Sequence, residues 1–416
     1  MLPLYLVIAA AILIFARSPE LFLHPRFWGE EGTIFFSESL RLGWTELLLA
    51  PRFGYLNFFA NITSLIAARL NLLDSAPLFT TLCAFLAQLV PVAVIAFSTS
   101  SHFNTINKKV LGILLMMFAG NTSELWLNSI NSMSYLSAAV FLILLEDENT
   151  LSPMKNVNYG ICLALSGLSG VLSCFLTPLF LLKAYKHKSK TVLIQALVLT
   201  SCTLIQIFYI LKTAMLPELG VHGRMTGLSL GSFFEIFLNR TIIVSIFGTY
   251  CADLFYQLLI SIKATHNRIT GVLSAILSLA VVFIFLRKLE KFKALTLGLS
   301  LLLVSALIVN TINGDKNSLL HPLYGIRYFY LPDLIFLFIL FLNVHWPLKD
   351  GSRMSKVAVL VLALALLTIP KKFREDLFID PSWPNWKSEL QEWRKNPAHP
   401  VRIWPTGWTV DLPKEY

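Results

Sequence analysis

Two adjacent glutamates, Glu30 and Glu31, are the residues of this sequence best suited to acid–base chemistry. They stand in the stretch FWGEEGTIFF, a few residues after an apolar segment. A glutamate with an ordinary pKa of about 4.3 is ionised at neutral pH and can take a proton from a hydroxyl group. The neighbouring Trp28 offers an aromatic face for a sugar ring. A structural role stays open, because carboxylates also stabilise the positive end of a helix that starts near Thr33.

Adjacent carboxylates also suggest a divalent cation site. Hard cations need several oxygen ligands, and no second acidic cluster stands out in another of the long connectors. We therefore expect neither a metal ion nor another cofactor.

Arginines are the candidates for binding an anionic group. Arg327, followed by Tyr328, stands in the stretch HPLYGIRYFYLPD at the start of an apolar segment. A guanidinium at such a boundary can bind a phosphate bidentately. Arg26, close to the glutamates, and Arg224, in the glycine-containing loop PELGVHGRMTG, are further candidates. The alternative for Arg327 and Tyr328 is anchoring of a span end at the membrane boundary.

Side chains suited to sugar binding occur in two segments. The stretch NTSELWLNSINSMSY combines Trp126 with the amides of Asn128 and Asn131. The C-terminal tail contains five of the nine tryptophans of the chain, including Trp404 and Trp408. Tryptophan faces pack on sugar rings as well as on lipid head groups. The tail is therefore either a saccharide platform or a membrane anchor.

These candidates require a membrane scaffold. Hydrophobic residues make up 56% of the 416 positions and charged residues 14%, whereas soluble domains contain roughly 25% charged residues. The segment between Lys190 and Lys212 contains 21 uncharged residues, enough to cross about 30 Å of hydrocarbon. The sequence predicts an all-α polytopic membrane protein with about 10–12 transmembrane helices, some of them short or re-entrant, and with juxtamembrane helices on the outer face.

Three short basic connectors, at 183–190, 287–293 and 349–356, predict the orientation because lysines and arginines are retained on the cytoplasmic side. The net charge of +10 follows from these connectors, so we expect no nucleic-acid partner. The N-terminus is then cytoplasmic and the C-terminus lies outside, with a further span at 240–262 left open. The spans are expected near residues 3–16, 77–97, 109–120, 133–146, 157–169, 171–185, 191–212, 270–286, 294–312, 329–345 and 356–370.

This topology divides the chain into a transmembrane domain, 1–370, and an outer C-terminal tail, 371–416. Long connectors usually carry function, so we expect the chemistry on the outer face, where the long connectors are 17–76, 121–132, 213–269 and 313–328. Two outer segments are predicted to form helices on the membrane surface, with apolar stripes made of Phe58, Phe59, Ile62, Ile66 and Leu70, and of Trp386, Leu390 and Trp393.

An acidic pair in the first outer connector, a following surface helix and a late Arg-Tyr at a span start resemble the GT-C superfamily of membrane glycosyltransferases, which use polyprenyl-phosphate sugars. More narrowly, FWGEEG, SGVLSCFLTPLFLLKA and the ending RIWPTGWTVDLPKEY resemble the serotype-converting O-antigen glucosyltransferases encoded by temperate phages of enteric bacteria. The resemblance extends over nearly the whole chain.

The resemblance implies an enzyme of the bacterial inner membrane that takes glucose from undecaprenyl-phosphate-glucose on the periplasmic face. It would transfer the glucose, with inversion, to lipid-linked O-antigen, and a donor synthase and a flippase would come from the same operon. Glu30 or Glu31 would be the base, and Arg327, with Arg26 or Arg224, would neutralise the departing phosphate. The alternatives are an O-antigen polymerase and a non-enzymatic lipid-linked sugar flippase, the latter less favoured because the span interiors are nearly free of charge.

Overall fold

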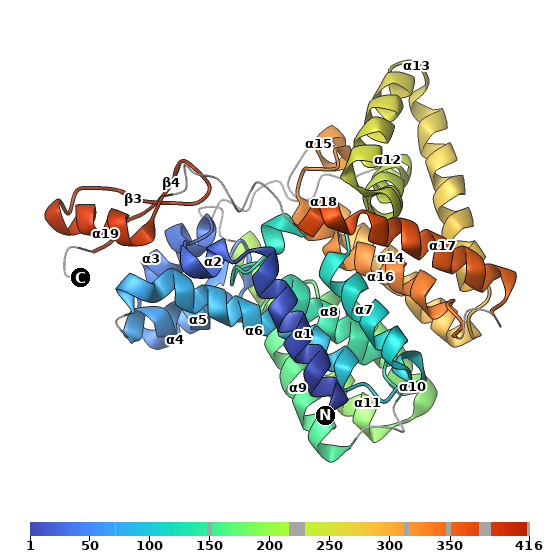
Figure 1. Cartoon of the computed structure of the whole chain (residues 1–416), viewed down its shortest axis with the longest axis horizontal. Helices are drawn as coiled ribbons and strands as arrows, with labels where there is room; N and C mark the ends of the chain where they lie inside the picture. Colours follow the sequence, from blue (N-terminus) through green and yellow to red (C-terminus); the bar gives the residue numbers. More distant parts are fainter. Residues whose placement is uncertain are drawn as a thin grey trace.

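A computed structural model describes residues 1–70, 72–120, 122–147, 152–215, 229–311, 316–346, 351–373 and 384–413, without the side chains of 263–268, 311, 316 and 372. This part of the chain is mostly helical (Figure 1). The α-helices are α1 (Leu2–Arg17), α2 (Glu20–Leu23), α3 (Ser37–Ser39), α4 (Trp44–Leu48), α5 (Phe58–Arg69), α6 (Ala76–Ala96), α7 (Ile106–Phe118), α8 (Ser132–Leu145), α9 (Pro153–Leu168), α10 (Thr177–His187), α11 (Lys190–Ala214), α12 (Leu230–Ile236), α13 (Val244–Leu286), α14 (Lys291–Thr311), α15 (Lys316–Leu320), α16 (Ile326–Leu342), α17 (Arg353–Leu367), α18 (Ile369–Phe373) and α19 (Trp386–Lys395).

Shorter elements complete the described chain. Two segments are π-helical, η1 (Glu31–Phe36) and η8 (Phe237–Ile243). Four are 3₁₀ turns, η2 (Leu73–Ser75), η3 (Ser101–Phe103), η4 (Ser123–Leu125) and η6 (Cys174–Leu176). Two antiparallel hairpins pair β1 (Pro51–Arg52) with β2 (Tyr55–Leu56), and β3 (Val401–Ile403) with β4 (Trp408–Val410).

Six helical segments of the described chain are long and apolar enough to cross a membrane, and the protein is therefore a helical multi-pass membrane protein, as the sequence predicts. A helix also covers most of each of the other predicted spans, but several of these helices are short. Among them, α8 and α16 are surrounded by other helices along nearly their whole length, so their length need not match the bilayer. The six segments are Leu73–Ala96, Lys190–Ala214, Leu230–Ile262, Ile269–Leu286, Lys291–Asn310 and Arg353–Lys371.

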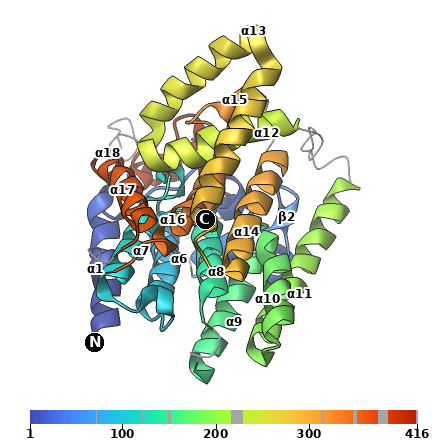
Figure 2. The same cartoon turned by 90° about the vertical axis from the view of Figure 1, so that its right-hand side faces the viewer.

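Helix α16 forms the centre of the main hydrophobic core. It is apolar on all faces, which is typical of a buried helix, and it contacts α7, α8, α13, α14 and α17. Figure 2 shows α16 between α17 and α14. Because α16 starts at Ile326, this core fixes the place of Arg327 in its first turn.

Helix α13 extends away from the rest of the bundle and bends back, so that it forms two arms (Figures 1 and 2). The returning arm contacts α12 where two glycines meet: a methyl group on Gly271 would lie 2.7 Å from the Cα of Gly231. The sequence placed 213–269 in an outer connector and left a span at 240–262 open. The structure has helix from Leu230 onward, and the segment Leu230–Ile262 is long and apolar enough to cross a membrane by length and composition.

Both predicted surface helices exist, but their apolar faces differ in what covers them. In α5 the predicted stripe is half-buried to exposed, and the polar Asn57, Asn61 and Ser64 are buried in the protein. In α19 the stripe is buried against the segment 27–76 of the same chain. The prediction that the α19 stripe faces the membrane is therefore wrong, because Trp386 packs edge-on against Phe27 and covers it.

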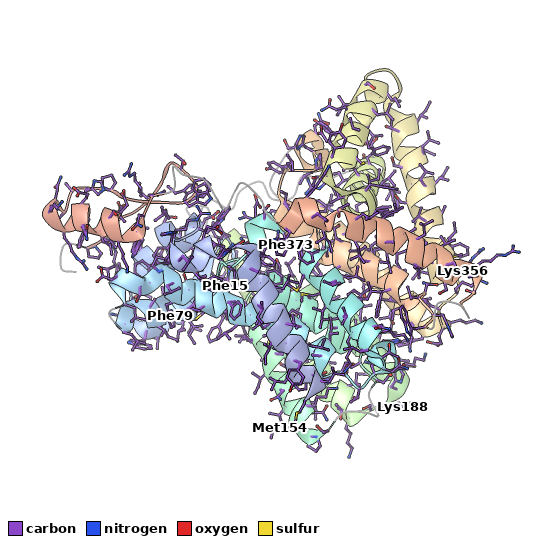
Figure 3. All side chains as sticks on the ribbon, viewed as in Figure 1. Phe15, Phe79, Met154, Lys188, Lys356 and Phe373 are labelled. Atoms are coloured by element: carbon purple, nitrogen blue, oxygen red, sulfur yellow. The ribbon has the colours of Figure 1, made fainter. Side chains whose placement is uncertain are left out.

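Lysines of two basic connectors, Lys188 and Lys356, lie along the lower and right-hand edge in Figure 3, together with Met154. The C-terminal tail lies at the opposite end of the same view (Figure 1). The basic connectors and the tail are thus well separated.

Candidate functional site

The two π-helical segments mark the candidate site. The π-helix is rare, and it occurs frequently at functional sites. Each of the two segments carries a buried charged side chain, Glu31 in η1 and Arg240 in η8. Of these two residues, the sequence analysis singled out only Glu31.

The carboxylate of Glu31 is buried and fully engaged. Its side chain is 2% exposed. The backbone N–H and the hydroxyl of Ser129 donate to Oε1 at 2.8 and 2.6 Å, and the backbone N–H of Trp28 donates to Oε2 at 3.2 Å. Burial raises the pKa of Glu31, and the hydrogen bonds from Ser129, Trp28 and Thr80 counter part of this rise. Glu31 therefore ties the segment 27–36 to the loop that contains Ser129.

Glu30 differs from its neighbour in accessibility. It is half-buried and stands at the N-terminal end of η1. Its carboxylate accepts no hydrogen bond from any residue that the structure describes. A carboxylate in this position remains free to accept a proton from a ligand.

Arg327 is half-buried in the first turn of α16. Nη2 donates a hydrogen bond to the hydroxyl of Tyr328 at 3.2 Å. Glu30 and Glu124 both act electrostatically on Arg327. Within the described ranges, neither carboxylate comes close enough to form an ion pair with it. The guanidinium thus has N–H groups with which it can bind an anion.

The C-terminal tail packs directly on the acidic segment (Figure 1). The backbone N–H of Gly29 donates to the carbonyl of Trp404 at 2.6 Å, and the N–H of Trp404 donates to the carbonyl of Phe27 at 3.3 Å. The guanidinium of Arg26 lies over the Trp404 ring, 4.4 Å from its centroid. A methyl group on Gly32 would lie 2.6 Å from Cδ1 of Ile403. The tail and the first outer segment therefore form one unit.

Trp408 is the predicted sugar-binding tryptophan that keeps an exposed face. It is 37% exposed, whereas Trp404 is 5% exposed. The Trp408 ring lies next to Gly29, where a methyl group would come within 3.7 Å of it. Trp28 is half-buried and pairs with Trp404 through an isolated backbone bridge. The exposed indole of Trp408 thus stands beside the residue that precedes Glu30.

The other predicted sugar-binding residues stabilise the loop 122–132. The side-chain amides of Asn128 and Asn131 each donate to the backbone carbonyl of Glu124 at 2.8 Å. Trp126 is buried, with the guanidinium of Arg17 3.9 Å from its ring centroid. These contacts shape the loop that brings Ser129 to Glu31.

Sequence reasoning missed three residues of this region, Ser129, Arg17 and Arg240. Both arginines are buried charged residues in or beside apolar segments, and a charge in such a segment is a signal of function. Ser129 carried no signal, because its partner lies 98 positions away in the sequence.

Arg224 lies outside the described residues. Among those that are described, no group of three or more His, Cys, Asp or Glu side chains is arranged to hold a metal ion. Comparison with known proteins found no relative: no family model, no curated protein and no solved structure matches the chain. The geometry of the site is therefore the basis for a functional conclusion.

Proposed function

We propose that the protein is a glycosyltransferase of the bacterial inner membrane that moves glucose from undecaprenyl-phosphate-glucose to lipid-linked O-antigen. The reaction takes place on the periplasmic face and changes the serotype of the cell. In this topology the N-terminus is cytoplasmic and the C-terminus is periplasmic, with GT-C-like transmembrane helices between them. A donor synthase and a flippase supply the donor on that face.

One observation carries this proposal. Glu30 and Arg327 are nearly 300 positions apart in the sequence, but the fold brings their segments together. Glu31 is hydrogen-bonded to Ser129 of the loop 122–132, and η4 of that loop contacts α16, whose first turn carries Arg327. Glu30 acts electrostatically on Arg327 but forms no ion pair with it. A base and a cation separated by more than contact distance suit a reaction in which an acceptor hydroxyl and a departing phosphate lie between them.

The proposed reaction is a single inverting displacement. Glu30 takes the proton of an acceptor hydroxyl while the hydroxyl oxygen forms a bond to the anomeric carbon of glucose. The bond from that carbon to the phosphate oxygen breaks, and its electron pair leaves with the phosphate of the lipid carrier. Arg327 neutralises the charge of this leaving group. A phosphate needs little protonation to leave, so one carboxylate suffices.

The structure favours Glu30 over Glu31 as the base. Both oxygens of Glu31 already accept hydrogen bonds within the protein, and its side chain is buried. Glu31 instead holds the segment on which Glu30 stands. This assignment narrows the choice between the two carboxylates that the sequence leaves open.

Trp408 completes the acceptor side of the proposed site. Its exposed indole face next to Gly29 provides a surface on which a sugar ring of the O-antigen packs. Trp404, together with Arg26, fixes the tail that carries Trp408.

The decisive experiment compares glutamate variants in an O-antigen strain supplied with undecaprenyl-phosphate-glucose. Mass analysis of the polysaccharide should show one added hexose per repeat unit with the wild type, and Glu30→Gln should reduce the addition at least about 100-fold. Glu46→Gln, at an exposed position in the same outer segment, is the matched control and should keep full activity.

Full modification by Glu30→Gln would remove Glu30 as the base. Two other outcomes would support different functions. Longer O-antigen chains with an unchanged repeat unit would indicate a polymerase. Movement of labelled donor across vesicles without an acceptor would indicate a flippase.

A further inference from the structure

The loop that leads into α16 is held by two side chains of η8. Nη1 of Arg240 donates to the backbone carbonyls of His321 and Tyr324, the latter at 2.6 Å. Nδ2 of Asn239 donates to the carbonyl of Leu320 at 2.9 Å. Three carbonyls of the loop 320–325 are thus bound by neighbouring residues of one π-helical segment. Arg327 follows this loop by two residues.

Arg240 is buried in a way that makes its charge costly. It is 2% exposed, and its guanidinium lies over the ring of Phe329, 4.2 Å from the centroid. Asp333 and Glu124 act on it electrostatically. In the part of the chain that the structure describes, however, no carboxylate forms an ion pair with it. Burying a charge without a contacting counter-ion is expensive.

A neutral donor would bind the same carbonyls at a smaller cost, as Asn239 does beside it. The positive charge of Arg240 therefore indicates a role besides binding these carbonyls. The guanidinium of Arg240 lies over Phe329, which follows Arg327 by two residues in α16, so the two positive charges belong to the same end of this helix. Two positive charges there attract an anion more strongly than Arg327 alone.

We infer that Arg240 is a positioning residue for binding of the donor phosphate. It orients Arg327 by holding the preceding loop, and its buried charge adds to the positive potential at the phosphate without contacting the donor. This inference rests on the proposed function, because it assigns Arg240 to the donor side of that same site.

Steady-state kinetics in native membranes test the inference with three variants. Arg240→Gln removes the charge, and donor KM should rise on the order of tenfold, the size that a unit charge produces over about 10 Å at a protein's effective dielectric constant. Arg240→Lys keeps the charge but changes the geometry of the two carbonyl bonds that Nη1 makes, so its donor KM should rise less. Asn239→Ala removes one carbonyl bond and no charge.

Hydrogen exchange provides the second measurement, because it reports the loop and not the reaction. Backbone amides of 320–326 should exchange faster in Asn239→Ala and in both Arg240 variants. Acceptor KM should stay unchanged in all three, since a general loss of structure would raise both KM values.

Several results would overturn the inference. Unchanged donor KM in a correctly inserted Arg240→Gln protein would do so, and so would an equal rise in donor and acceptor KM. If Arg240→Gln does not insert into the membrane, the other two variants decide. An unchanged donor KM in Arg240→Lys together with unchanged hydrogen exchange in Asn239→Ala would then also overturn the inference. Absence of any transfer by the wild type would instead refute the proposed function itself.

Discussion

Replacing Gly32 by alanine tests whether the C-terminal tail is an integral part of the site. Gly32 lies in η1, one residue after Glu31, and the tail hairpin covers it. A methyl group there would lie 2.6 Å from Cδ1 of Ile403 and 2.9 Å from both Cβ of Phe27 and Cγ2 of Val410. Carbon atoms do not approach so closely, so the hairpin must move away or the segment must shift.

The expected cost follows from this crowding. Extra methyl groups in a well-packed region destabilise by about 1–3 kcal/mol. Three atoms from two different segments crowd the position, so we expect a value near the upper end, about 2–3 kcal/mol. Movement of the hairpin away from η1 also weakens the hydrogen bond from Gly29 to Trp404, so transfer activity should fall together with stability.

Thermal unfolding in detergent and limited proteolysis of the tail measure the two effects. Gly43→Ala is the matched control, because a methyl group at Gly43 meets no atom within 4 Å. In Gly32→Ala, cleavage between 384 and 413 should become faster, and in Gly43→Ala it should not. Ile403→Val removes the Cδ1 atom that lies nearest and should restore part of the stability and activity of Gly32→Ala.

Wild-type stability and an unchanged rate of tail cleavage in Gly32→Ala would refute this reasoning. A loss that Ile403→Val does not reduce at all would also contradict it. In that case the effect would come from the backbone of η1 and not from contact with the tail.

Three further predictions concern single side chains. Burial raises the pKa of Glu31, so the contribution of this carboxyl to stability is lost as pH rises through the raised pKa, and the hydrogen bonds from Ser129 counter this loss because they favour the ionised form. Ser129→Ala should therefore lose about 1.5–3 kcal/mol of stability above the raised pKa and less below it. An equal loss in unfolding measurements on both sides would contradict the assignment. At Gly120 the backbone φ is +58°, and an added methyl group would lie 2.0 Å from Oδ2 of Asp333. Gly120→Ala should therefore lower the free energy of unfolding by about 3 kcal/mol or more. Gly407→Ala has the strained φ without the crowding and should lower it by only about 1 kcal/mol in the same unfolding measurement. Trp408→Ala should raise acceptor KM roughly 3- to 10-fold while Trp408→Phe keeps most of the affinity, and equal KM in all three proteins would leave Trp408 without a role in acceptor binding.

Much of the fold can be predicted from the sequence, because long apolar runs form helices both in contact with lipid and in the protein core. Runs such as 191–212 are helical as predicted. The tail was harder to predict, since its tryptophans suit a membrane surface and a protein core equally well. Its place depends on the backbone hydrogen bonds from Gly29 to Trp404 and from Trp404 to Phe27, which no pattern of residue types reveals.

For the site as well, residue types could be read from the sequence, but contacts between distant segments could not. Glu30, Glu31 and Arg327 stood out by residue type and by their position beside apolar segments. The distinct environments of the two glutamates did not, because they arise from Ser129 in another loop. The contribution of Arg240 depends on the carbonyls of a loop 81 positions away in the sequence.

Proximity of positions 30 and 327 on the outer face is the claim that most needs a direct measurement. The background protein has Cys251, the exposed native cysteine, changed to serine, and carries Glu30→Cys and Arg327→Cys. Intact cells are divided into two samples, one treated with a membrane-impermeant thiol reagent and the other with a short bifunctional one. We expect both cysteines to react from the periplasm and to cross-link to each other. Labelling of the two positions from opposite sides of the membrane would contradict the shared site and the reaction proposed for it.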